Sequence, residues 1–327
     1  MKGSLLFLSL FVAANALTEF TLPVTFSNGV GPSVSLVVDT MFTQSFVLGR
    51  EWFGEKAGRG KTYDPAQSKY SKRIDYWRAH SYSNGEIYGT VSGAIYSDRV
   101  GSFPDDVEAS FLVGQELDRG YPAKNLNGTY VAGHLGIARE KDGPTQTNLA
   151  DKVLAQTENK VWCGEAIRSS QRYLQRSILG ILPQDHQIVT RIPSKEYIRD
   201  WALTGRNVTT SGKALVPGAR IAISSVVDKI LFPRDNFSKA VRLFEATRVG
   251  ERYKVDCNGN YDIDFVAGGQ DVRIESVDLV EKEGEECFLK IGLSLDELFY
   301  FGLPFFANRG ICFNFDLDEI ILYNPIL

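Results

Sequence analysis

Short runs of alternating or continuous apolar residues occupy most of the chain, and each run has the length and composition of a β-strand. They are separated by Gly, Asn, Asp and Pro, which favour turns. Examples are "FTLPVTF", "VSLVVD", "GAIYSDRV", "ARIAISSVV", "YDIDFVAGG" and "EIILYNPIL". Helical periodicity is confined to a few stretches such as "NLADKVLAQTE" and "RDNFSKAVRLFEAT". The pattern predicts a mainly-β protein built in two parts.

A faint repeat links the two parts. "PSVSLVVDTMF" in the first half and "ARIAISSVVDK" in the second are both apolar strands that end at a polar pair. Each is followed further along the chain by a short element with a glycine, in "HLGIA" at Gly136 and in "FYFGLP" at Gly302. Two similar halves that face each other would form a cleft, which is a common place for a binding site.

The chain has 327 residues, of which 43% are hydrophobic, enough for a large core in one or two domains. The formal net charge is −4, and the basic residues are dispersed along the sequence. A nucleic-acid-binding protein would show a clustered basic footprint instead, so no nucleic-acid partner is expected.

Residues 1–16, "MKGSLLFLSLFVAANA", have the features of a secretory signal peptide. Lys2 gives the positive start, Leu5–Val12 the apolar segment, and Ala14–Ala16 the small-residue cleavage site. The apolar segment is shorter than the roughly 20 residues that span a bilayer, and we find no later segment that is long enough. We therefore expect a secreted, extracellular protein without a membrane anchor, whose mature chain begins near Leu17.

Sequons and cysteines agree with export. Three acceptor sequons for N-glycosylation stand at Asn127, Asn207 and Asn236. The four cysteines are Cys163, Cys257, Cys287 and Cys312. This even number permits three disulfide connectivities in an oxidising compartment. No two cysteines are close enough in sequence to form a zinc-ligand pair, so we expect disulfides and no metal.

Several stretches resemble, in order, landmarks of the pepsin-like aspartic proteases. "VSLVVDT", "YDPAQSKY", "YGTVSGAIYSDRV" and "AGHLGIA" are similar to the first catalytic loop, the segment after it, the flap hairpin and the glycine element behind the loop. "ARIAISSVVDKILFP" resembles the second catalytic loop, and "FYFGLPFFANRGICFNFDLDEIILYNPI" the closing strands. The resemblance implies an all-β, bilobal fold with an N-terminal lobe at 17–187 and a C-terminal lobe at 188–327. It also implies a sheet shared by the lobes and a long peptide-binding cleft.

Catalysis in this family requires two aspartates, one in each lobe. One carboxylate acts as a base on a water while the other, protonated, polarises the peptide carbonyl, because their mutual repulsion splits their pKa values. Asp39 supplies the first. The apolar lead-in of the second loop aligns Ser225 with the other aspartate, and Val226 and Val227 with the Thr and Gly that follow it. The alternative acid is Asp228, which leaves a shorter lead to the next proline.

A serine does not replace a carboxylate, because its hydroxyl does not ionise at useful pH. A nucleophilic serine would need a positioned base. The three histidines, His80, His134 and His186, lie in no recognisable triad spacing. We expect each of them to be a surface residue or a hydrogen-bonded structural residue.

The other loop substitutions favour the same interpretation. Met41 and Val227 place side chains where the family has glycines beside an open water site. Thr40 retains one of the two loop hydroxyls of the family, whereas Val226 has a similar shape without the hydroxyl. Groups that act as a unit lose their effect together, so proteolysis by the family mechanism should be nearly absent. Asp39 is interpreted as a remnant.

The resemblance also implies disulfide pairs and a flap tyrosine. Cys257–Cys287 matches the bridge of the C-terminal lobe. Cys163 and Cys312 fall in stretches that resemble the sheet beneath the lobes, so they are predicted to pair and tie the lobes together, with two free thiols as the alternative. "HSYSNGEIYGTVSG" offers Tyr82 or Tyr88 as the flap tyrosine.

The sequence therefore predicts a secreted, monomeric pepsin-like homologue that is catalytically inactive, needs no cofactor, and binds a peptide or protein in the interlobe cleft. The groove and flap candidates are Thr40, Met41, Tyr82, Tyr88, Val226 and Val227. A cleft filled by Met41, Phe42 and Val227 would argue against binding. One alternative is a weak or atypical aspartic endopeptidase that acts at acidic pH with Asp39 and Asp228 or another acid. Another is a structural, storage or immune-facing protein whose groove has no ligand.

Overall fold

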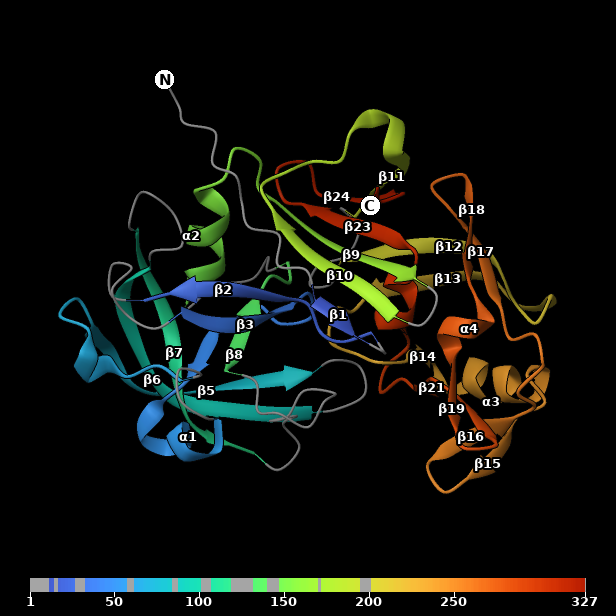
Figure 1. The fold of residues 1–327 in the computed structure, drawn as a ribbon, viewed down its shortest axis with the longest axis horizontal. Helices are drawn as coiled ribbons and strands as arrows, with labels where there is room; N and C mark the ends of the chain where they lie inside the picture. The colour runs from blue at the N-terminus through green and yellow to red at the C-terminus, as the bar shows by residue number, and fades with distance from the viewer. Residues whose placement is uncertain are drawn as a thin grey trace.

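The computed structural model describes residues 12–14, 17–26, 33–57, 62–83, 88–100, 107–118, 132–139, 147–169, 172–194 and 201–326. Strands dominate these ranges and form four sheets (Figure 1). The mainly-β class predicted from the alternating apolar runs is therefore confirmed. The described helices are few and short, and none of them is long and apolar enough to cross a membrane.

One seven-stranded sheet is built from the first half of the chain. In the order in which they lie side by side, its strands are β2 (Thr21–Thr25), β3 (Ser33–Asp39), β8 (Gly133–Gly136), β4 (Phe46–Leu48), β7 (Val107–Leu117), β6 (Tyr88–Val100) and β5 (Lys72–Ser83). β3 pairs with β2 antiparallel and with β8 parallel. β4 pairs with β8 antiparallel and with β7 parallel.

The second half repeats this arrangement. Its strands, in order, are β18 (Gln270–Ile274), β17 (Ile263–Ala267), β12 (Ala202–Thr210), β13 (Lys213–Ile223), β22 (Phe299–Phe301), β14 (Ile230–Phe232) and β21 (Ile291–Leu293). The order β12-β13-β22-β14-β21 has the same succession of antiparallel and parallel pairs as β2-β3-β8-β4-β7. The faint sequence repeat is thus a repeat of topology.

A six-stranded sheet joins the two halves. Its strands, in order, are β1 (Val12–Ala14), β10 (Arg172–Leu179), β9 (Val161–Ser169), β23 (Arg309–Asn314), β24 (Glu319–Tyr323) and β11 (Ile188–Pro193). In Figure 1 it lies between the blue-green and the orange strands. Cys163 on β9 and Cys312 on β23 are directly paired in the register and form a disulfide. The predicted covalent tie between the halves is confirmed.

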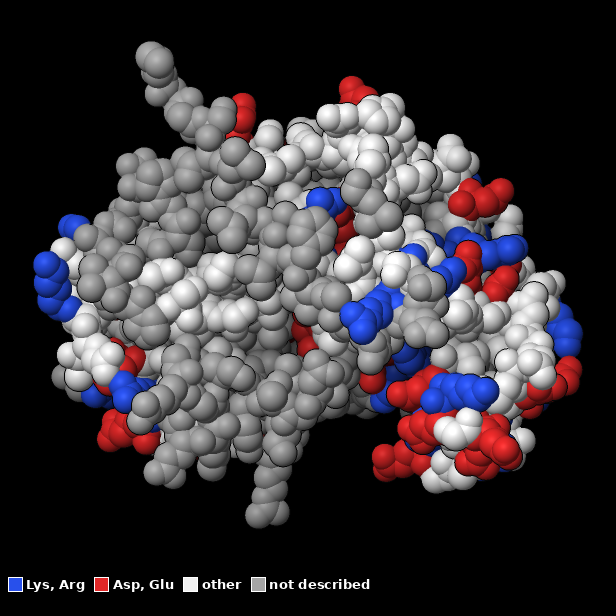
Figure 2. All heavy atoms as spheres, viewed as in Figure 1, with Lys and Arg blue, Asp and Glu red and all other residues white. Residues whose placement is uncertain are grey.

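The fourth sheet is small, and Figure 2 shows acidic and basic side chains gathered over this lower right part of the molecule. Its strands are β15 (Thr247–Val249), β16 (Arg252–Val255), β20 (Glu286–Leu289) and β19 (Val280–Glu283). Cys287 on β20 forms a disulfide with Cys257, which confirms the second predicted pair. The helices are α1 (Arg50–Ala57), α2 (Leu149–Ala155), α3 (Arg234–Leu243) and α4 (Ser276–Leu279), with short 3₁₀ turns η1 (Pro65–Gln67), η2 (Asp185–Gln187) and η3 (Leu303–Phe306).

Helix periodicity explains which helices the sequence predicts. α2 and α3 fall within the two stretches with helical spacing. On α3, Ala240 is buried, while Phe237 and Val241 pack against the core. α1 was not predicted, because "REWFGEKA" carries no apolar stripe; Phe53 is buried, whereas the adjacent Trp52 is exposed.

One continuous hydrophobic core contains buried residues of both seven-stranded sheets and of the six-stranded sheet. Trp162 of the first half stacks on Phe313 of the second, with ring centroids 5.5 Å apart. Phe20 packs against both Trp162 and Phe306. Burial of an aromatic side chain contributes roughly 2–3 kcal/mol. The shared core and the Cys163–Cys312 disulfide thus hold the two halves against each other.

Most of the predicted signal peptide lies outside the described residues. Within it, Val12–Ala14 form β1 and pair antiparallel with Tyr173–Gln175 of β10. β1 is the edge of the sheet, so removal of residues 1–16 would leave five strands with every remaining pair intact. Cleavage at Ala16 remains a prediction.

Candidate functional site

The site is built around Asp39, the last residue of β3. Its side chain is 0% exposed. The Oδ1 atom accepts a hydrogen bond of 2.9 Å from the backbone N–H of Met41. The Oδ2 atom lies 2.7 Å from Nδ1 of His134. Within the described ranges, these two groups are the hydrogen-bond partners of the Asp39 side chain.

Parallel pairing of β3 with β8 brings His134 to Asp39. Val37 is the register partner of His134, and Asp39 that of Gly136. The imidazole is 3% exposed and stacks on Phe46, with ring centroids 5.1 Å apart. His134 is therefore hydrogen-bonded, as expected, but its partner is the candidate catalytic carboxylate. The two residues are 95 positions apart in the sequence, so no local pattern predicts this contact.

The other histidines have no part in this site. His186 is exposed in η2, consistent with a surface residue. His80 on β5 is buried, and its Nε2 has no hydrogen-bond partner among the described residues. Burial, with a smaller contribution from the charge of Arg78, lowers the pKa of His80. Its imidazole is therefore neutral at physiological pH.

Thr40 and Ser225 join the two loops through reciprocal hydrogen bonds. Thr40 Oγ1 donates to the carbonyl of Ile223 at 2.8 Å and accepts from the N–H of Ser225 at 3.0 Å. Ser225 Oγ donates to the carbonyl of Val38 at 2.6 Å and accepts from the N–H of Thr40 at 3.1 Å. Each hydroxyl satisfies buried backbone groups of the other loop, so Thr40 and Ser225 occupy equivalent positions.

Ser224 consequently occupies the position that corresponds to Asp39. Its Oγ accepts from the backbone N–H groups of Val227 at 3.2 Å and Val226 at 3.4 Å, as Asp39 accepts from Met41. The sequence aligns Ser225 with the second aspartate and Val226 and Val227 with the two residues after it, whereas these hydrogen bonds move the correspondence by one residue. Ser225 therefore keeps the second loop hydroxyl, which the sequence assigns to the position of Val226, and Val226 rather than Val227 matches Met41. A serine occupies the position in either alignment.

The two glycine elements support this register. A Cβ on Gly136 would lie 2.6 Å from the carbonyl oxygen of Phe42, and a Cβ on Gly302 would lie 2.1 Å from that of Val227. Only glycine permits such close backbone approach. Phe42 and Val227 each lie three residues beyond the matched Asp39 and Ser224, so both loops are braced in the same way.

Apolar side chains follow both loops. Phe42 and Val227 are buried in separate clusters, one in each half. Met41 is half-buried and packs against the second-half cluster of Ala202, Ala222, Val227, Leu231 and Tyr300. The three side chains therefore pack within or against the apolar clusters of the two halves, and a groove between the halves remains a prediction.

The arrangement brings acid–base and hydroxyl groups together in buried positions. Asp39 and His134 form a buried carboxylate–imidazole pair. The hydroxyl of Ser225 is hydrogen-bonded to Val38 and Thr40. Asp228, the alternative acid, is half-buried and lies four residues beyond Ser224, in a place that matches Thr43 of the first loop. Burial of polar groups is costly unless they are hydrogen-bonded, and each of these buried groups has a partner.

The remaining predicted site residues are only partly placed. Tyr82 and Tyr88 lie at the tip of the β5–β6 hairpin, where Tyr82 pairs with Gly89 and Ser83 with Tyr88; the side chains of both tyrosines lie outside the described part. Asn127 also lies outside it. Asn207 is exposed on β12 with a positive φ of 52°, and Asn236 is half-buried on α3. The described residues contain no cluster of metal-ligating side chains.

No protein-family model matches the chain, and no curated protein matches it either.

Proposed function

We propose that this chain is a secreted homologue of the pepsin-like aspartic proteases that does not hydrolyse peptides and acts by binding a peptide or protein between two similar β lobes. The lobes would comprise residues 17–187 and 188–327. No cofactor is required, and a monomer suffices because each lobe contributes one wall of the groove.

The observation that carries this proposal is the pairing of Asp39 with His134 where Ser224 occupies the matching position. Hydrolysis by the family mechanism needs two carboxylates that share a proton. Here the single carboxylate has an imidazole on one oxygen and a backbone N–H on the other. Neither oxygen is exposed to hold an attacking water.

Three features support the bilobal architecture. The first is the five-strand topology that both halves repeat. The second is the six-stranded sheet to which each half contributes three strands. The third is the reciprocal bonding of Thr40 and Ser225, which places the two loops face to face.

Binding surface is available on the β5–β6 hairpin, which resembles the family flap. Ile74 is 58% exposed and Trp77 is 48% exposed on β5, and β5 is the outer strand of its sheet. Tryptophan side chains such as that of Trp77 are among those that contribute most of the binding energy at protein interfaces. The ligand would lie beneath the hairpin and beside Met41.

The proposal is tested with a peptide array probed by the secreted, purified chain. We expect a subset of extended peptides to be retained intact, with Trp77→Ala lowering affinity at least tenfold, because loss of an aromatic anchor costs more than about 1.4 kcal/mol. Trp52→Ala, at an exposed tryptophan of α1, is the matched control and should leave affinity within twofold. Retention of no peptide, or equal effects of both substitutions, would contradict a groove beneath the hairpin.

A further inference from the structure

A second site lies away from Asp39, on the six-stranded sheet. The strand register aligns Arg176, Glu165, Gly310 and Tyr323 in one row across β10, β9, β23 and β24. A neighbouring row contains Ile178, the Cys163–Cys312 disulfide and Ile321. Alternate residues of a strand point to the same face. A polar row and an apolar row therefore run side by side on one face of the sheet.

The polar row is internally paired. Arg176 forms an ion pair with Oε2 of Glu165, and the hydroxyl of Tyr323 donates to Oε1 at 2.5 Å. Glu165 is 3% exposed. Burial, and then the adjacent Glu165 carboxylate, raise the pKa of Tyr323 well above its usual range, so the phenol remains a donor. A Cβ on Gly310 would lie 2.0 Å from the tyrosine ring, and its absence lets the ring cross the strand.

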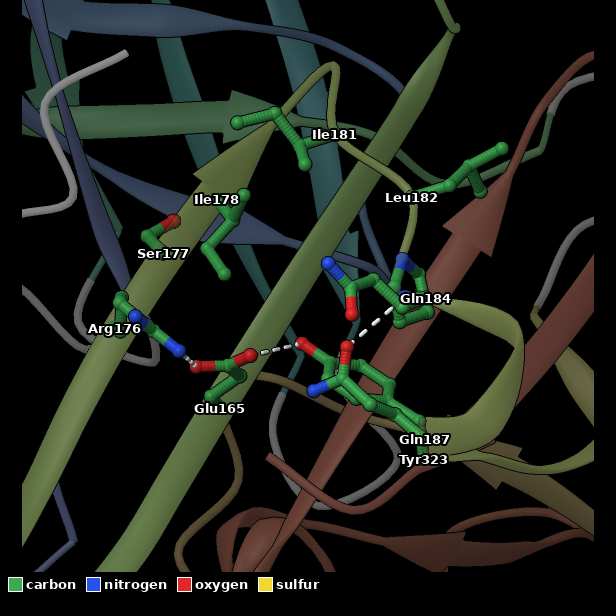
Figure 3. Close-up of a pocket in the computed structure, with 10 residues that line it drawn as sticks. Glu165, Arg176, Ser177, Ile178, Ile181, Leu182, Gln184, Gln187 and Tyr323 are labelled. Carbon is green, nitrogen blue, oxygen red and sulfur yellow. Dashed lines mark hydrogen bonds and ion pairs between the residues drawn. The ribbon is translucent and has the colours of Figure 1, made fainter. Parts of the chain in front are cut away.

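The loop between β10 and β11 covers this face and leaves a cavity of about 320 Å³. Figure 3 shows Arg176 and Tyr323 converging on Glu165 from two sides, with Ile178 near Arg176 on the same strand and Ile181 and Leu182 on the loop that borders the cavity. The carboxamide oxygen of Gln187 accepts from the N–H of Gln184, which fixes the turn at one end. Ile181 and Gln184 are exposed and lie at the rim of the cavity.

Charge and size limit what this cavity can hold. The positive and negative charges of the polar row compensate each other, so a charged ligand would be buried without a counter-ion, which is strongly unfavourable. Ile178, Ile181 and Leu182 give the cavity an aliphatic part that favours an apolar body. A cavity of about 150 Å³ accepts benzene. A volume about twice as large fits a bicyclic or similarly sized molecule of roughly ten to fourteen non-hydrogen atoms.

We propose that this cavity is a binding site for a small neutral amphiphile, with its apolar body against Ile178 and Leu182 and a hydroxyl or comparable polar group at the rim beside Gln184. The site is independent of the cleft near Asp39 and does not depend on the proposed peptide-binding function.

The probe is 2-naphthol, a neutral fluorescent bicyclic alcohol, titrated into the full chain at neutral pH. We expect saturable one-to-one binding with a dissociation constant of roughly 10–100 µM, which is ordinary for about eleven non-hydrogen atoms. The anion naphthalene-2-sulfonate should bind at least tenfold more weakly. Absence of saturable binding, or equal affinity for both probes, would overturn the proposal.

Two variants locate the site. Ile178→Trp fills the cavity and should weaken 2-naphthol binding at least tenfold, whereas Val249→Trp, a tryptophan at an exposed strand position of β15, should leave it within twofold. Glu165→Gln removes the negative charge and leaves Arg176 without its counter-ion. This variant should bind naphthalene-2-sulfonate at least tenfold more tightly than the wild type does. Unchanged 2-naphthol binding in Ile178→Trp, or no gain for the sulfonate in Glu165→Gln, would refute the assigned site.

Discussion

Replacement of His134 by leucine tests the buried pair at the centre of the candidate site. The substitution retains an apolar body against Phe46 but removes the imidazole from Oδ2 of Asp39. The carboxylate would keep one partner, the N–H of Met41, in a position with no solvent exposure. A buried carboxylate that loses its partner is the perturbation with the largest expected effect in this part of the molecule.

Its magnitude follows from burial. Removal of one member of a buried charged pair destabilises proteins by about 3–5 kcal/mol, because the remaining charge is neither solvated nor paired. Replacement of both members by apolar residues is close to neutral. His134→Leu should therefore lower the free energy of unfolding by about 3–5 kcal/mol, while adding Asp39→Leu in the same chain should restore at least about 2 kcal/mol of it.

The measurement is urea unfolding at pH 7 of the wild type, both single variants and the double variant, followed by tryptophan fluorescence. His186→Leu, at an exposed histidine, is the matched control and should change the free energy by no more than about 0.5 kcal/mol. A loss below about 1 kcal/mol in His134→Leu, or additive effects of the two leucines, would refute a coupled buried pair.

Three further predictions concern the junction of the halves and the six-stranded sheet. Thr40→Val removes the hydroxyl that donates to the carbonyl of Ile223 and accepts from the N–H of Ser225. Because two buried backbone groups then lose their partners, the free energy of unfolding in urea should fall by about 2–4 kcal/mol, and a loss below about 1 kcal/mol would contradict the reciprocal bonding. Serine at both positions of the Cys163–Cys312 pair should lower stability by about 3–5 kcal/mol, since the disulfide spans 149 residues; an unchanged urea midpoint would contradict this. The raised pKa of Tyr323 means that the unfolded chain loses this proton near pH 10 while the folded chain keeps it, so stability should fall as pH rises above about 10. Tyr323→Phe should flatten that fall, and an identical profile would show that Tyr323 does not contribute to it.

Local sequence patterns predict much of this fold because strand and turn signals are local. The alternating run that ends at Asp39 is β3, and the stripe at Phe237, Ala240 and Val241 is α3. Both disulfides match their predicted pairs. α1 lacks periodicity, and its position is set by tertiary contacts such as the burial of Phe53.

The candidate site is less predictable because its contacts are long-range. "ISSVV" contains two adjacent serines, and the apolar lead-in alone does not decide which of them matches Asp39. Hydrogen bonds to Thr40, 185 residues away, fix Ser225 and so assign Ser224. His134 reaches Asp39 only through parallel strand pairing. The polar row of the proposed amphiphile site likewise depends on a long-range contact, because Tyr323 lies 158 residues from Glu165.

Peptide hydrolysis is the most direct test of the central claim, that one carboxylate paired with an imidazole does not cleave amides. The secreted chain and its Asp39→Ala variant are incubated with denatured haemoglobin at about pH 3–5, with and without pepstatin, and new termini are counted by mass spectrometry. We predict equal, background numbers of termini in all four samples. Pepstatin-sensitive cleavage by the wild type that Asp39→Ala abolishes would contradict the account.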